Sequence, residues 1–227
     1  MAARSIYDLY LIYQDIIRKQ IGVFRTNLEF NRDINSAGLD CIQEWFESYG
    51  ATNNLHDALL PLRKRYQFAS DSGGVVVNPS DYSHRLGGAW TVTGSTVNEI
   101  TFVQDTEFVF AINSQQRPVS NSYPIAIDYA IEIGGSPTNV QKGFQIFPNQ
   151  VQIGFYWYLK LPQPMSLVYT QVGRTITYDS VASVQPYFPD VYMNHVLSRA
   201  LWYAGVAMSE EEVSQFAQSY NNETKQE

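Results

Sequence analysis

Apolar side chains in the first part of the chain recur every three or four residues, which is the period of an amphipathic helix. This stripe predicts a helix that begins at Ser5 and stops at Gly22, because glycine accepts the left-handed conformation of a helix end. After a turn around Asn27–Arg32, the same period predicts a second helix over Ser36–Tyr49. The N-terminal segment is therefore expected to be helical, and its last short helix is expected to break at Pro61.

Beyond the helical segment the apolar period falls to two, which is typical of β-strands with one buried face. Glu99–Gln104 and Glu107–Asn113 both alternate in this way, and their spacing predicts a paired hairpin with its turn near Gln104–Thr106. In Ile125–Ile133 the alternation is clean, and we expect the odd-numbered residues, Tyr129 among them, to face the core.

The longest alternating run is Val151–Leu161. One set of alternate side chains is apolar and predicts a core face: Val151, Ile153, Phe155, Trp157, Leu159 and Leu161. The opposite set includes Tyr156, Tyr158 and Lys160, which is more aromatic surface than a solvated face usually carries. This pattern leaves two alternatives for what covers the tyrosines, namely a neighbouring protein or the chain's own helices.

The last part of the chain is helical again. Pro189 suits the first turn of a helix that Gly205 ends, and Ser209 with Glu212 forms a capping box for a final helix. The order helices, strands, helices predicts an α+β fold, with N- and C-terminal helices packed on a largely antiparallel β-sheet or β-sandwich core. We expect one compact domain with three segments: an N-terminal helical segment (1–66), a β-rich core (67–185), and a C-terminal helical segment with its tail (186–227).

Composition narrows the classes of function. Only 16% of the 227 residues are charged while 14% are aromatic, a balance that favours protein contacts through neutral polar and aromatic groups. The net charge of −7 and the lack of a basic run beyond Leu62–Arg65 argue against sequence-specific DNA binding. We expect a protein without a signal peptide or membrane helix, and the single Cys41 excludes an intrachain disulfide.

Residues with catalytic or metal-binding chemistry are few. His56, His84 and His195 are far apart in the sequence, and none stands in a metal-binding spacing. Asp81–Arg85 holds an aspartate, a serine and a histidine, but sequence neighbours rarely form a working triad. We therefore predict no catalytic residues, no metal site and no cofactor, and expect that the protein is not an enzyme.

Several blocks of the chain, taken in order, resemble the ring or head-to-tail adaptor proteins of crAss-like tailed bacteriophages. The resemblance runs from about Glu29 to Tyr220. Its blocks are Phe30-Asn31 with Ala37, Pro79–Tyr82, the aromatic strand that ends in Leu161-Pro162-Gln163-Pro164, Tyr178-Asp179-Ser180, and the closing pair of helices. No block is a catalytic signature.

The resemblance implies a structural, non-enzymatic virion protein. About twelve identical copies would form a ring in the neck, between the portal and other neck or tail ring proteins, and double-stranded DNA would pass through its lumen without sequence-specific binding. The ring would assemble in the bacterial cytoplasm and end in the virion. On this reading we expect a subunit interface at Tyr156, Tyr158, Lys160, Pro162 and Pro164.

Two alternatives from other classes remain at this point. Aromatic-rich β-sandwiches also bind sugars, so a carbohydrate-binding adhesin or tail receptor-binding component is one alternative. A glycan-active enzyme is the other, but Asp128 and Glu132 on one strand face would lie about 13 Å apart, beyond the usual separation of catalytic carboxyls. Weak candidates for acids that line a ring lumen are Asp105, Glu107 and Glu210–Glu212, for which a solvated surface is the simpler interpretation.

Overall fold

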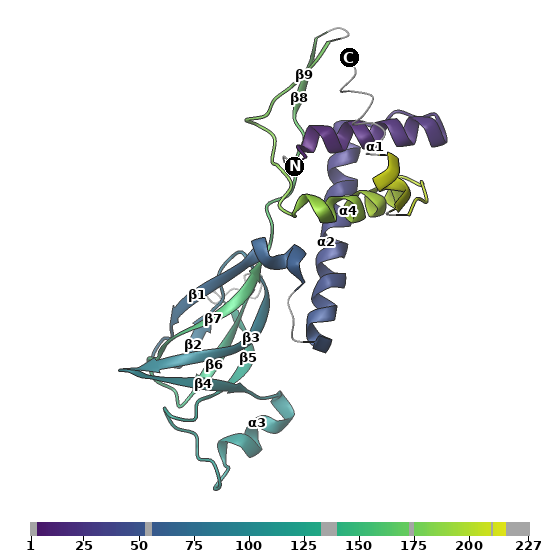
Figure 1. The fold of residues 1–227 in the computed structure, drawn as a ribbon. Coiled ribbons are helices and arrows are strands. Elements are labelled where there is room, and N and C mark those ends of the chain that lie inside the picture. Colours follow the sequence, from purple (N-terminus) through teal and green to yellow (C-terminus); the bar gives the residue numbers. More distant parts are fainter. Residues whose placement is uncertain (1–3, 53–55, 133–139, 173–174, 210, 217–227) are drawn as a thin grey trace. The chain divides into compact units, whose positions relative to one another are not determined.

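The computed structural model describes residues 4–52, 56–132, 140–172, 175–209 and 211–216. The chain divides into two compact units rather than the single domain that we expected. The helical unit comprises Met1–Pro61 and Pro162–Glu227, and the sheet unit is the continuous segment Leu62–Leu161. Figure 1 shows the elements of each unit.

In the helical unit the longer described helices are α1 (Ile6–Ile21), α2 (Asn27–Thr52) and α4 (Asp190–Tyr203). A two-stranded antiparallel hairpin, β8 (Tyr169–Val172) and β9 (Thr175–Tyr178), belongs to the same unit. The predicted β-rich core (67–185) includes these residues. The boundary at residue 185 is therefore wrong, because the chain leaves the sheet unit at Leu161.

Helix α1 begins and ends where the sequence predicts. Ser5 is its N-cap, and its hydroxyl accepts a hydrogen bond from the backbone N–H of Asp8 while the Asp8 carboxylate accepts one from the Ser5 N–H. This reciprocal pair satisfies two backbone donors that no helical carbonyl reaches. At the other end Gly22 has a φ of 71°, the left-handed conformation that ends the helix.

Helix α2 is longer than predicted, and the prediction of a turn at Asn27–Arg32 is wrong. Thr26 and Glu29 form a second capping box at this point, with the Thr26 N–H donating to Glu29 at 2.9 Å and the Glu29 N–H donating to Thr26 at 3.3 Å. Because the box starts the helix here, Asn27–Arg32 is its first turn and a half. The Thr-x-x-Glu pattern was present in the sequence as a signal for this start.

Aromatic side chains join the helices of this unit to one another. Phe30 of α2 is fully buried and packs edge-on against Tyr10 and Tyr13 of α1, at ring-centroid distances of 5.3 and 5.1 Å. Trp45, also in α2, packs edge-on against Phe188 at 5.1 Å, directly before α4. The apolar faces of the terminal helices are thus buried within the helical unit itself.

The sheet unit contains a seven-stranded sheet with the order β1-β7-β3-β4-β5-β6-β2. Every pairing is antiparallel except that of β4 with β5, so the expected α+β class and the largely antiparallel sheet are confirmed. The strands are β1 (Arg63–Ala69), β2 (Val75–Val77), β3 (Tyr82–Thr93), β4 (Thr96–Phe102), β5 (Ile125–Glu132), β6 (Val140–Phe147) and β7 (Ile153–Lys160). Strand β1 follows the short 3₁₀ helix Asp57–Leu62 directly, so the predicted helical segment ends before residue 66.

The sheet curls until its two edge strands approach each other, as the sheet unit in Figure 1 shows. The Tyr66 hydroxyl in β1 donates to the Val77 carbonyl in β2 at 3.4 Å, and a turn from Asp71 to Val75 links the two edges. One buried cluster takes at least one residue from every strand: Phe68, Val76, Ala89, Ile100, Ala126, Phe144, Ile146, Tyr156 and Tyr158. The sheet therefore encloses a side-chain core in the manner of a small, incompletely closed barrel.

The hairpin predicted from Glu99–Gln104 and Glu107–Asn113 does not form. Its second segment lies in a helix, α3 (Asp105–Ile112). The true partner of β4 is β3, and the two-residue turn at Gly94 joins them, where Gly94 has a φ of 61°. Asp105 and Glu107 lie in the first turn of α3, where carboxylates interact favourably with the helix dipole.

The predicted inward face of β5 is only partly correct, since Ile125 is buried as expected but the β5 residue in the shared core is Ala126. Ala126 is fully buried in the shared core, whereas Tyr129 is 51% exposed. Asp128 lies on the same strand face as Ala126 but is exposed, and it pairs with Arg85 of β3 through both carboxylate oxygens at 3.0 and 3.3 Å. None of the described helices combines the length and the apolar character needed to cross a bilayer.

Candidate interaction surfaces

Strand β7 presents the opposite face to the one predicted. Tyr156 and Tyr158 have exposed fractions of 0% and 1% and lie in the core of the sheet unit. Their hydroxyls donate to Asn78 Oδ1 at 2.7 Å and to Asp81 Oδ1 at 2.8 Å. Because both tyrosines are covered and hydrogen-bonded within the sheet unit, they offer no surface to a neighbouring protein. The strands of the sheet unit, and not helices, cover them.

Burial has electrostatic consequences for these tyrosines. Desolvation raises the pKa of Tyr156 well above its ordinary value, with a further contribution from the neighbouring tyrosines. Burial also raises the pKa of Tyr158, which is hydrogen-bonded to the Asp81 carboxylate. Both hydroxyls are therefore neutral donors at physiological pH and have a structural role.

A glycine in the same strand lies on the tyrosine face, at a point where the core packs closely. A Cβ atom at Gly154 would lie 2.1 Å from the Trp90 carbonyl oxygen and 2.4 Å from the ring of Phe68. Gly154 thus permits a close approach between β7 and the side chains beneath it. The alternation of Val151–Leu161 places Gly154 on the same face as Tyr156 and Tyr158, and a glycine inside a strand pattern is a signal of close packing.

The outward face of β7 and its neighbours carries aromatic rings that arginines cover. The Arg63 guanidinium lies over the Trp157 ring, 4.3 Å from its centroid, and Arg65 lies over Phe155 at 4.1 Å. Phe155 in turn stacks on Trp90 of β3, with a centroid distance of 5.4 Å and an interplanar angle of 25°. Cation–π contacts of this kind stabilise exposed sites by about 0.5–1 kcal/mol each.

The same face continues as an apolar surface. Ile153 pairs with Val92 of β3 and is 62% exposed, while Val92 is 36% exposed. We name the surface formed by Arg63, Arg65, Trp90, Ile153, Phe155 and Trp157 the aromatic stripe. Along β7 it changes from a basic, aromatic end at Trp157 to an apolar end at Ile153.

Helix α3 forms a second exposed surface in the sheet unit. None of its residues is buried. Phe108 fixes the helix by packing on Phe147 at the end of β6, with ring centroids 4.8 Å apart. Val109 and Phe110, in contrast, are 61% and 80% exposed. The helix therefore presents an acidic first turn followed by an apolar end.

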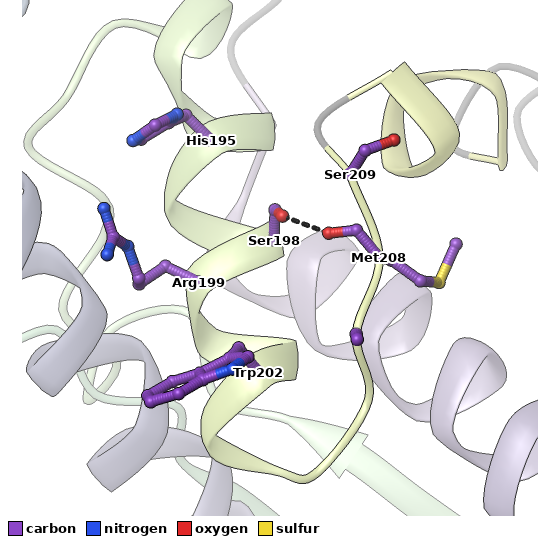
Figure 2. Close-up of a pocket in the computed structure, with 7 residues that line it drawn as sticks. His195, Ser198, Arg199, Trp202, Met208 and Ser209 are labelled. Atoms are coloured by element: carbon purple, nitrogen blue, oxygen red, sulfur yellow. Dashed lines mark hydrogen bonds between the residues drawn. The ribbon is translucent and has the colours of Figure 1, made fainter.

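The helical unit has a pocket of roughly 660 Å³ beside α4. Its lining residues come from α4 and from the segment after it: His195, Ser198, Arg199, Trp202, Ala207, Met208 and Ser209 (Figure 2). Ser198 donates to the Met208 carbonyl at 2.5 Å and so ties the two sides together (Figure 2). Ser209, one of the lining residues, caps the last helix, and its predicted capping box is confirmed by the Ser209–Glu212 hydrogen bonds.

Charged groups near this pocket are engaged with each other. Arg199 forms an ion pair with Glu44 of α2, and the His195 Nε2 atom lies 3.7 Å from the same carboxylate. Trp202 is 63% exposed. The Glu44 contacts join α4 to α2, and we assign this arrangement no chemical step.

The other histidines and the cysteine have structural surroundings. His56 stacks on Trp45 with a centroid distance of 5.2 Å and an interplanar angle of 4°. His84 Nδ1 lies 2.7 Å from the Ser83 hydroxyl, and burial lowers the pKa of this histidine. Burial raises the pKa of the Cys41 thiol to about 12, so it stays protonated and unreactive.

The remaining candidates also have assignable places. The Asp81 carboxylate pairs with Lys64 at 3.1 Å in addition to accepting the Tyr158 bond. The side chain of Glu132 and all of Glu210 lie outside the described residues, and no cluster of potential metal ligands occurs within them. For Lys160, Pro162 and Pro164, which the structure leaves wholly or partly accessible, an interface role stays a prediction.

Comparison with models of known protein families and with curated proteins found no match for this chain.

Proposed function

We propose that the protein is a structural virion component that forms a multi-copy ring in the head-to-tail connector of a tailed phage. The resemblance of its sequence blocks to the ring proteins of crAss-like phages suggests this role. The structural observation that carries the proposal is that one copy exposes two separate apolar surfaces, the aromatic stripe and α3. Closed rings need two different complementary patches on each copy, because their contacts are heterologous.

The distribution of charge also supports a ring that DNA traverses. The sheet unit carries seven lysines or arginines and seven aspartates or glutamates, and is neutral overall. The helical unit carries eight basic and fifteen acidic residues, so the net charge of −7 belongs to it alone. A neutral unit is suited to contacts between copies, and an acidic unit repels the phosphates of a passing duplex.

The aromatic rings of the stripe favour a protein partner over a sugar. Carbohydrate sites use open aromatic faces on which a sugar ring stacks. Here Arg63 already covers Trp157 and Arg65 already covers Phe155. The carbohydrate-binding alternative would require both guanidinium groups to move away.

Electron microscopy of the purified chain tests the proposed function. We expect closed rings of about twelve copies at high protein concentration, and gold-labelled antibodies against the chain should mark the neck of particles whose genome encodes it. Glycan arrays provide the contrasting measurement. A chain that stays monomeric at every concentration, leaves particles unlabelled and binds glycans would contradict the proposal and favour an adhesin.

A further inference from the structure

We propose that helix α3 of one copy docks onto the aromatic stripe of a second copy, so that the chain assembles head to tail. This inference rests on the proposed function and specifies its subunit contact. It is carried by three properties that α3 and the stripe share: complementary charge, matched length, and the same order of charged and apolar ends.

The charges on the two surfaces are complementary and free to pair. The stripe presents the exposed guanidinium groups of Arg63 and Arg65, which contact aromatic rings and form no ion pair with a carboxylate among the described residues. Asp105 and Glu107 in the first turn of α3 are exposed and likewise have no ion-pair partner in the described part of the chain. The stripe thus carries two basic groups without ion-pair partners among the described residues, and α3 of the same protein carries two such acidic groups.

The two surfaces also agree in length. The eight residues of α3 span about 12 Å, at 1.5 Å per residue. From Trp157 to Ile153 the stripe extends for about 13 Å along β7. A helix of this length can therefore cover the whole stripe, and the whole helix contacts it.

The order of charged and apolar ends fixes the direction of docking. In α3 the acids come first, followed by the exposed Val109 and Phe110. In the stripe the arginines lie toward Trp157, and Ile153 forms the apolar end. When the acids contact the arginines, Phe110 lies over the region of Ile153, so α3 runs antiparallel to β7 of the second copy.

Helix α3 cannot make this contact with the aromatic stripe of its own chain. Phe108 of α3 is packed on Phe147, and α3 lies against β5. In the sheet order β5 is three positions from β7, which corresponds to about 14 Å across the sheet. Because α3 is fixed at this distance, a second copy must supply the stripe, and the contact is heterologous.

Charge reversal with rescue tests the contact. The stripe variant carries Arg63→Glu and Arg65→Glu, the helix variant carries Asp105→Arg and Glu107→Arg, and the swap variant carries all four substitutions. A control variant, Arg117→Glu with Lys142→Glu, changes the charge equally on exposed positions outside the stripe and removes the Arg117–Tyr123 ring contact. Sedimentation velocity over a concentration series measures assembly, and circular dichroism verifies folding.

We expect each reversal to raise the concentration at which half of the chain is assembled by about tenfold or more, and the swap variant to restore assembly. The control variant should assemble like the wild type. If the stripe variant fails to fold, the helix variant decides the test, because its side chains are exposed and outside the core. Rings that survive both reversals would overturn this contact and leave the ring proposal intact.

Two other outcomes separate the remaining possibilities. A wild-type chain that never assembles contradicts the proposed function and this contact together. Binding of a single-stranded oligonucleotide, measured by fluorescence anisotropy and lost in the stripe variant alone, would make the stripe a nucleic-acid surface and overturn the docking of α3.

Discussion

The guanidinium group of Arg65 lies over the ring of Phe155, 4.1 Å from its centroid, on the outward face of β7. This contact explains how one sheet can carry aromatic residues on both faces. Inside, tyrosines fill the core and their hydroxyls reach Asn78 and Asp81. Outside, arginines cover the rings and keep a charged group in water.

Removal of the Tyr156 hydroxyl should affect stability and leave assembly unchanged. Tyr156→Phe loses the 2.7 Å bond to Asn78, and we expect a decrease of about 1 kcal/mol in the free energy of unfolding. Tyr156→Ala removes a fully buried ring and should cost about 3–5 kcal/mol. Urea denaturation measures both values. If Tyr156→Phe abolished assembly without loss of stability, the assignment of this residue to the core would be wrong.

Gly154→Ala should destabilise the sheet unit severely. The new Cβ would lie 2.1 Å from a backbone carbonyl oxygen of the neighbouring strand β3, and that oxygen cannot move without loss of strand pairing. We expect a loss of about 2–3 kcal/mol or more in the free energy of unfolding. Gly73→Ala is the matched control, since its Cβ would meet no backbone atom but only the side chains of Asp71 at 3.3 Å and Val75 at 3.9 Å. Equal melting temperatures for the two variants would contradict the packing at β7.

The capping boxes of the helical unit should make its stability depend on pH in the acidic range. Hydrogen bonds from the backbone and hydroxyl of Thr26 lower the pKa of Glu29, and those from Ser209 lower the pKa of Glu212. A carboxylate whose pKa is lower in the folded state stabilises that state above its unfolded pKa. The contribution is then lost as pH falls from about 4.5 through the folded value.

Glu29→Gln separates this effect from general acid denaturation. Glutamine can still accept the Thr26 hydrogen bonds, but it does not titrate. We expect the variant to lose less stability than the wild type when thermal melts at pH 7 and pH 3 are compared. Identical losses in the two proteins would show that Glu29 has no part in the acid sensitivity.

The elements that the sequence predicts well are those set by local signals. Helix α1 is one, since Ser5 with Asp8 and then Gly22 mark its two ends within the helix sequence itself. The start of α2 is set by an equally local signal, the Thr26–Glu29 capping box. These elements depend on backbone groups that nearby side chains satisfy, so the sequence contains the necessary information.

The predictions that failed depend on tertiary neighbours. Residues 107–113 alternate as a strand would, but β3 and β5 already pair with both edges of β4, and the segment forms α3 instead. In β7 both faces are aromatic, so periodicity alone could not decide which one is buried. The buried face is the one that packs closely at Gly154 against Phe68 of β1 and the Trp90 carbonyl of β3, and these neighbours are a property of the sheet order.

A mixing experiment tests the head-to-tail contact through its apolar end. Phe110→Asp disables α3 and Ile153→Asp disables the stripe, so each variant alone should be monomeric in mass photometry. In a mixture, the intact α3 of the Ile153→Asp chain can dock on the intact stripe of the Phe110→Asp chain. The remaining α3 and stripe are both disabled, so the assembly must stop at two copies. Dimers that form only on mixing are a signature of heterologous contacts. An isologous interface that includes these residues would give no recovery, and rings in either single variant would show that assembly uses other surfaces.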